Sequence, residues 1–259
     1  MTKRIEKAKP KDCRSFRRLQ AKVLRAGDLS LILDENRDLW ALPQQMSAKK
    51  FIEFLLNETK LQKVVLKAQN YEATETRYIW GKASAYAVGL SLRHHTYLTH
   101  SSAVFLHGLT DQIPKTIFVN YEQSAKPQSQ GKLSQEGIDR AFSNRQRESK
   151  FWFDYEDYRL MLLSGKATGR LEVTTIKSEL GESLDVTKLE RTLIDIAVRP
   201  VYAGGVFQVL EAYKQAKDQV SVNTLLATLK NFSTSIHIIK PSGFIWKGLA
   251  TKKANGQSF

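Results

Sequence analysis

The segment from His100 to Asp111 contains the residue types of a hydrolase triad. Ser101 is a candidate nucleophile, His100 and His107 are candidate bases, and Asp111 is a candidate acid. A nucleophile elbow needs glycines on both sides of the serine, and Ser101 has none. His107 lies one turn from Val104 and next to a glycine, so it is interpreted as a hydrogen-bonded packing residue. The pattern therefore predicts no triad.

Two groups of carboxylates are the next candidates for chemistry. They are Asp154, Glu156 and Asp157 in the run FDYEDY, and Asp185, Glu190 and Asp195 around Lys188. Carboxylates beside a lysine can hold Mg²⁺ and activate water, as in metal-dependent nucleases. The order of an Asp followed by a strand-borne Glu-x-Lys is missing, however. A metal-dependent nuclease is therefore the alternative hypothesis, and a non-enzymatic protein without a cofactor is favoured.

Composition limits the other classes of function. His94 and His95 lack the Cys, Asp or His spacing of a metal site, and the single cysteine, Cys13, cannot form an internal disulfide. No run approaches the roughly 18 to 20 apolar residues of a membrane span, and the basic amino terminus lacks the apolar segment of a signal peptide. The sequence predicts a cytoplasmic protein with no membrane partner, and its 259 residues favour two domains.

Positive charge is concentrated at the amino terminus. Residues 1–27 hold ten Lys or Arg residues against Glu6 and Asp12, a local excess of eight in a chain whose net charge is +14. Cationic side chains bind polyphosphates with the release of condensed counterions. We expect Arg14, Arg17 and Arg18 to contact DNA phosphates. A solvated tail is the alternative interpretation.

Periodicity predicts three helices and a hairpin, the first helix beginning within this arm. The apolar spacing favours a first helix from Phe16 to Leu24 that ends at Gly27, and a second segment, Leu29 to Leu42, that ends at Pro43. Ser47 can cap a third helix over residues 48–57. The strand-like runs LQKVVLKA and TETRYIWG follow, joined by a polar turn. This is the order of a winged helix-turn-helix, in which the third helix enters the major groove.

A second domain is predicted from Ala85. HSSAVFLHGL reads as a short helix, capped by Thr99 or Ser101 and closed by Gly108, and KTIFVNY reads as a strand. A basic patch spans Asp139 to Lys150; salt bridges to the acids of FDYEDY are favoured there over an extended nucleic-acid surface.

The stretch VTKLERTLIDIAVRPVYAGG, Val186 to Gly205, predicts a capped helix. Thr187 and Glu190 have capping-box spacing, which predicts a helix start near Lys188. An apolar stripe then continues until Pro200, which ends the run. The two glycines at the end of the stretch allow a close turn into another helix.

This order of cap, Glu-Arg-Thr, Leu-Ile-Asp, Arg-Pro and Gly-Gly resembles the C-terminal domain of the AbiEi antitoxin family, from abortive-infection toxin–antitoxin pairs. Two further blocks resemble the same family in the same order, Glu75 to Lys126 and Leu133 to Phe151. The resemblance covers about residues 16 to 232. After Phe232 the chain departs from the family's pattern, which is interpreted as a truncated or altered C terminus.

The resemblance implies an α+β fold, with a winged helix-turn-helix over residues 1–84 and a mixed α/β AbiEi-like domain over residues 85–259. It implies an antitoxin that represses its own operon by binding promoter DNA, with a nucleotidyltransferase-like toxin as partner. Direct contact with the toxin stays open. On the matching segments, the DNA-binding residues would be Ser47, Lys49 and Lys50 at the start of the recognition helix, and Gln69, Asn70 and Arg77 on the wing. A nuclease that carries the same winged-helix domain is the alternative.

Overall fold

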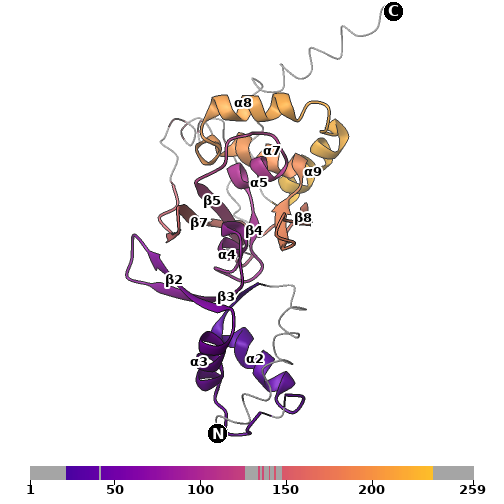
Figure 1. The fold of residues 1–259 in the computed structure, drawn as a ribbon. Coiled ribbons are helices and arrows are strands. Elements are labelled where there is room, and N and C mark those ends of the chain that lie inside the picture. Colours follow the sequence, from indigo (N-terminus) through magenta and orange to yellow (C-terminus); the bar gives the residue numbers. More distant parts are fainter. Residues whose placement is uncertain are drawn as a thin grey trace, which may run out of the picture.

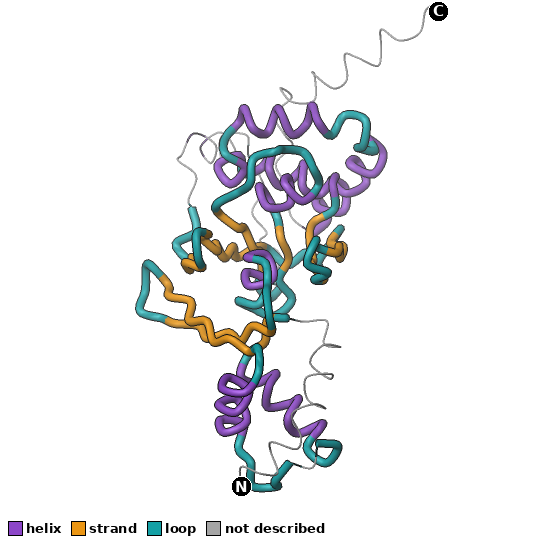
Figure 2. Tube along the Cα trace, in the orientation of Figure 1, coloured by secondary structure: helices purple, strands orange, loops and turns teal. Residues whose placement is uncertain are grey.

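The structure is a computed structural model that describes residues 22–40, 42–125 and 148–235, together with Ser134, Glu136, Arg140 and Ser143. Figure 1 shows an elongated arrangement, with helices α2 and α3 at one end, a sheet in the middle, and helices α5, α7, α8 and α9 at the other end. Helices and strands both contribute to it, so the expected α+β class is confirmed at this level (Figure 2). Within the described ranges, every helix is too short or too polar to cross a membrane.

One sheet runs through the described part of the chain. Its strand order is β1-β3-β2-β6-β7-β5-β4-β9-β8. The strand bounds are β1 Val23–Leu24, β2 Leu61–Ala68, β3 Thr74–Trp80, β4 Tyr97–Leu98, β5 Thr116–Glu122, β6 Trp152–Tyr155, β7 Tyr158–Gly165, β8 Val173–Lys177 and β9 Ser183–Thr187. The pairs β5–β7 and β4–β9 are parallel, and the other pairs are antiparallel.

The first elements differ from the expected helix. Val23 and Leu24 form β1, which pairs with β3, and helix α2 spans Ala26–Asn36. Gly27 therefore lies in the first turn of α2 and does not close a preceding helix, so this prediction is wrong for residues 23–27. The apolar spacing there reflects one strand followed by one helix, because Leu24 and Leu29 contribute to the same core. Residues 16–21 lie outside the described ranges.

Helices α2 and α3 enclose the first core. Helix α3 spans Ala48–Glu58 and buries Phe51, Ile52 and Leu55, as its apolar spacing predicts. These side chains meet Leu29 and Leu33 of α2, and the ring of Trp40 stacks on that of Phe51 with the centroids 6.0 Å apart. The core continues onto Leu61 of β2 and Tyr78 of β3.

The β2–β3 hairpin also contributes to a second hydrophobic core, formed with residues of the later strands. Lys67 and Ala68 of β2 pair with Asp154 and Phe153 of β6, so the sheet continues past residue 85. On one face of the hairpin, Leu66 and Ile79 pack with the buried residues of helix α4, which spans Ala85–Leu90, and of strands β5, β7 and β9. The hairpin thus connects two hydrophobic cores.

Four helical segments cover the far end of the sheet together with α5, which spans His100–Leu106. They are α7 Leu189–Val198, the 3-10 turn η1 Pro200–Ala203, α8 Val206–Gln215 and α9 Val222–Ser235. Leu193 and Ile196 of α7 are fully buried in the core that these helices share. Pro200 ends α7, as expected. The positive φ angles of Gly204 (+86°) and Gly205 (+107°) form the predicted turn into α8.

The predicted capping box of α7 is wrong. Thr187 is the last residue of β9, and α7 begins one residue after Lys188, with no side-chain cap. The Thr187 hydroxyl instead lies 2.8 Å from the Thr192 hydroxyl, and both side chains are buried. Glu190 accepts from the Ser221 backbone N–H at 3.1 Å and so anchors the start of α9. The spacing of a capping box is present, but Thr192 of α7 and Ser221 before α9 take the two side chains.

Candidate nucleic-acid interface

The start of helix α3 has the features predicted for it. The Ser47 hydroxyl accepts from the Lys50 backbone N–H at 3.4 Å, which confirms Ser47 as the cap. Lys49 and Lys50 are exposed, and the first turn holds no acidic residue. The positive end of the helix dipole and two exposed ammonium groups therefore lie together, an arrangement that favours phosphate.

Arg37 fixes the turn that leads into α3. One of its guanidinium nitrogens, Nη1, donates to the carbonyls of Pro43, Gln44 and Met46 at 2.9, 3.3 and 3.2 Å. The other, Nη2, forms an ion pair with Asp34 at 3.1 Å. The side chain thereby adds a donor for carbonyls of the irregular loop between α2 and α3. Sequence reasoning missed this role, since only the nearby proline marks the turn.

The two faces of the β2–β3 hairpin differ in chemistry. Side chains alternate across a strand, and the register places Lys63 opposite Tyr78, Val65 opposite Thr76 and Lys67 opposite Thr74. Tyr78 packs in the core of α2 and α3, so this face is the one that adjoins the helices. Lys63 and Lys67 are exposed on it. Sequence reasoning missed both lysines, although the alternation in LQKVVLKA separates them from Val64 and Leu66.

Arg77 lies on the opposite face, so its predicted contact with DNA is wrong. Arg77 and Ile79 are two residues apart in β3, so their side chains point to the same face of the hairpin. The Arg77 side chain is only 3% exposed. The guanidinium donates to the Ser91 carbonyl at 3.1 Å, to the Ser91 hydroxyl at 3.0 Å and to the Leu92 carbonyl at 3.2 Å. An ion pair with Glu75 at 3.0 Å and a hydrogen bond to the Thr76 carbonyl at 2.8 Å add to these contacts. Arg77 joins the hairpin to the segment after α4.

The tip of the hairpin is attached to β6. The Gln69 side-chain amide donates to the Asp154 carboxylate at 2.5 Å, and the Asn70 amide donates to the Lys150 carbonyl at 2.9 Å. The Tyr71 ring meets the Phe151 and Phe153 rings edge-on, at centroid distances of 5.3 and 6.2 Å. Gln69 and Asn70 are exposed, as a wing contact requires, but each already has an internal partner.

The basic arm can be followed only in part. Arg14, Arg17 and Arg18 lie outside the described residues. Lys22 donates to the Leu180 carbonyl, and Arg25 contacts Ser91 and His94, so these two cations have internal partners. Residues 28–84 hold eight basic and eight acidic residues. Any DNA affinity of this part must therefore arise from where its lysines lie rather than from its net charge.

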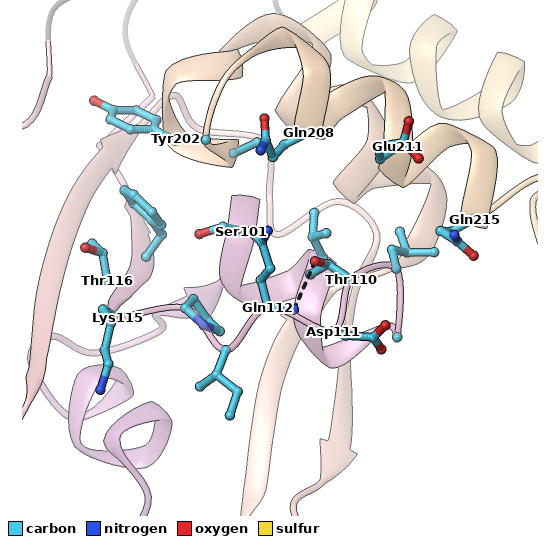
Figure 3. A pocket seen from close by; sticks show the side chains of 18 of the residues that line it. Ser101, Thr110, Asp111, Gln112, Lys115, Thr116, Tyr202, Gln208, Glu211 and Gln215 are labelled. Atoms are coloured by element: carbon cyan, nitrogen blue, oxygen red, sulfur yellow. Dashed lines mark hydrogen bonds between the residues drawn. The ribbon is translucent and has the colours of Figure 1, made fainter.

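The residues with the types of a hydrolase triad have separate roles in the structure. The His107 ring lies 2.7 Å from the Thr187 carbonyl through Nε2, which confirms its structural role. Burial lowers the pKa of His100 to about 4, against the opposing effect of Asp195. Ser101 and Asp111 line a pocket of about 700 Å³ between α5, α8 and the segment before β5. Figure 3 shows the Asp111 carboxylate pointing away from the Ser101 hydroxyl.

Three carboxylates of the nuclease alternative have separate partners. Asp185 pairs with Arg170 at 2.5 Å, and Asp195 pairs with Arg191 at 3.0 Å, while Asp154 binds Gln69. In the Arg191–Asp195 pair Arg191 is buried and Asp195 is partly buried, and the Arg191 guanidinium lies 4.4 Å from the centroid of the Phe232 ring. Among the described residues, no three His, Cys, Asp or Glu side chains are grouped to hold a metal ion.

In comparisons with known proteins, no family model matches this chain and no curated protein matches its sequence. The geometry of the described residues therefore carries the functional argument.

Proposed function

We propose that this protein binds duplex DNA through a winged helix-turn-helix, of which the described part is residues 22–40 and 42–84. The observation that carries the proposal is the pairing of β1 with β3 around the two helices. The chain runs β1, α2, α3, β2, β3, and the strands lie in the order β1-β3-β2. This order supports α3 as the recognition helix and the β2–β3 hairpin as the wing beside it.

In this proposal, two pairs of lysines have different tasks. Lys49 and Lys50 stand at the amino end of α3, from which recognition helices contact base edges. Lys63 and Lys67 stand on the hairpin face that adjoins α2 and α3, where they would contact phosphates of the same duplex. Gln69 and Asn70 would contribute through the side-chain amide groups that their internal hydrogen bonds do not use. Arg14, Arg17 and Arg18 would add phosphate contacts from the arm.

The biological role we propose is that of a non-enzymatic, cytoplasmic antitoxin that represses its own operon. Its support is the sequence resemblance to the AbiEi family in three separated blocks. The partner would be a nucleotidyltransferase-like toxin encoded beside it, and neutralisation need not involve direct contact. The separate partners of Asp154, Asp185 and Asp195 support this role over that of a nuclease.

The test is a binding titration with the chain's own promoter DNA and with a random duplex of equal length, by fluorescence anisotropy. The proposal predicts tighter binding to the promoter, and a loss of that preference in Lys49→Ala and Lys50→Ala. Lys217→Ala, at an exposed lysine just after α8, is the matched control. Equal binding of both duplexes by the parent protein would refute it.

The same DNA is then incubated with Mg²⁺ or Mn²⁺ to test the nuclease alternative. We expect intact DNA. Metal-dependent cleavage that disappears in Asp154→Ala or Asp185→Ala would replace the proposed role with the nuclease.

A further inference from the structure

A second polar site lies where α2 meets the segment after α4. It is a crevice of about 500 Å³, lined by residues at the start of α2, by residues between 90 and 96 and by residues between 170 and 185. We call it the arginine–histidine crevice after its members Arg25, Arg93, His94, His95 and Arg170. The proposed DNA interface does not include these residues, so the crevice needs an explanation of its own.

The acidic side chains of the crevice are already engaged. Asp185 accepts from Arg170 at 2.5 Å and from the Thr175 hydroxyl at 2.6 Å. Asp28 accepts from the Arg25 backbone N–H at 2.7 Å. Arg25 lies close to other positive charge. Its pKa is lowered first by burial and second by the nearby Arg77 guanidinium. Positive charge is therefore in excess on the α2 side of the crevice.

Two arginines hold the histidine segment in place. Arg25 donates to the Ser91 carbonyl through Nε at 3.1 Å and through Nη2 at 2.7 Å, and Arg170 donates to the His95 carbonyl at 2.7 Å. His95 has a positive φ of 56°, an unfavourable conformation that these contacts help to maintain. The segment that carries Arg93 between these anchors is thus fixed before any ligand arrives.

The crevice retains hydrogen-bond donors. Within the described ranges, the exposed Arg93 guanidinium and the His95 ring have no hydrogen-bond or ion-pair partner. Arg25 Nη1 lies 2.5 Å from His94 Nε2. Because an arginine can only donate, His94 Nε2 is the acceptor and His94 Nδ1 carries the proton. His94 therefore offers an N–H, and Arg25 has N–H groups beyond those that bind Ser91 and His94.

We propose that the arginine–histidine crevice binds a phosphate group, held mainly by Arg93 and Arg25 and completed by the His94 N–H and the His95 ring. Arginine is suited to this anion because its planar donors match two phosphate oxygens at once. The phosphate can belong to a small molecule or to a nucleic-acid backbone. The site does not depend on α3 acting as a recognition helix.

The experiment is isothermal titration calorimetry of the full chain with inorganic phosphate, with chloride keeping the ionic strength constant. We expect saturable binding that Arg93→Gln weakens roughly tenfold, the effect of losing one charge-assisted contact. Arg199→Gln makes the same substitution at an exposed arginine after α7 and should bind phosphate like the parent. Melting curves of both variants should match the parent, since both side chains are exposed.

Two further arms identify the source of the phosphate. If saturating phosphate leaves the affinity for duplex DNA unchanged, the natural ligand is a small phosphorylated molecule. If phosphate competes with DNA and Arg93→Gln weakens DNA binding while Arg199→Gln does not, the ligand is the DNA backbone. The proposal is overturned if phosphate gives no saturable signal and Arg93→Gln leaves DNA binding unchanged. A chain that binds phosphate but no duplex would refute the DNA-binding function and leave this site standing.

Discussion

Arg77 on β3 and Ser91 after α4 form a double contact, in which Nε of the arginine lies 3.1 Å from the carbonyl and 3.0 Å from the hydroxyl of the serine. Arg25, at the start of α2, donates to the same carbonyl. One serine carbonyl therefore joins the hairpin, the start of α2 and the segment that carries the arginine–histidine crevice. Any change in this contact affects the connection between the two cores.

Replacing Arg77 should destabilise the protein without acting directly on DNA. Arg77→Met removes the bonds that a side chain only 3% exposed makes to Glu75, Thr76, Ser91 and Leu92, and it leaves the Ser91 and Leu92 oxygens with fewer donors. We expect a loss of about 3 kcal/mol in the free energy of unfolding, measured by urea titration. Arg159→Met, at an exposed arginine of β7, is the control. An unchanged stability together with weaker DNA binding would return Arg77 to the interface.

The lysines of α3 and the cations around it should differ in their effects on DNA binding. Lys49→Ala or Lys50→Ala should narrow the gap between promoter and random DNA, since a good base contact provides about 1 to 3 kcal/mol of discrimination. Lys63→Ala and Lys67→Ala should weaken both duplexes similarly and flatten the salt dependence by about 0.9 per lost phosphate contact.

The same salt titration applies to Arg14, Arg17 and Arg18, whose neutralisation should also weaken all sequences alike. If the arm substitutions close the gap between promoter and random DNA while the α3 substitutions preserve it, the sequence-reading element has been misassigned.

Leu193 should be a determinant of folding. Its side chain is fully buried between α7, α8 and α9, so Leu193→Ala should reduce the free energy of unfolding by about 2 to 5 kcal/mol. Val198→Ala, in the same helix at 43% exposure, should cost far less and serves as the control. A Leu193→Ala protein with the parent's melting temperature but no antitoxin activity would show that α7 acts in function rather than in folding.

His100 should make stability depend on pH. Burial lowers its pKa in the folded protein to about 4, whereas an unfolded histidine titrates near 6.5. Between these values the unfolded chain binds the extra proton, so stability falls as the pH falls from about 6.5 to about 4, by up to roughly 3 kcal/mol.

The check is urea unfolding of the parent and of His100→Asn at pH 7, 5.5 and 4.5. Asparagine tolerates the positive φ of 52° at this position and cannot take up the proton. As the pH falls, the variant should lose less free energy of unfolding than the parent. Parallel pH profiles would show that His100 is protonated as easily in the folded state as in the unfolded one.

Patterns that depend on neighbours in the sequence predicted local structure well. The Ser47 cap, the burial of Phe51, the hairpin after α3 and the end of α7 before Pro200 all occur as expected. Each depends on backbone hydrogen bonding or steric limits within a few residues. The capping box at Thr187 failed for the opposite reason, since the buried Thr192 and the distant Ser221 compete successfully for the two side chains.

The side to which a hairpin residue points was beyond the sequence. Alternation groups Arg77 with Ile79 and separates both from Tyr78, but it does not say which face is open. Both faces are covered near the base of this hairpin, one by α2 and α3 and the other by α4. Only the packing of the two cores placed Arg77 inside and left Lys63 and Lys67 exposed.

The sequence by itself therefore determined the order of most helices and strands, the cap of α3 and the uneven distribution of charge, because these follow from short-range chemistry. The tertiary structure decided that β1 replaces part of an expected helix, that one sheet connects both halves of the chain, and that Arg25, Arg93 and Arg170 meet around two histidines. Such groupings join residues more than fifty positions apart. No local periodicity records which distant segments will share a core or a crevice.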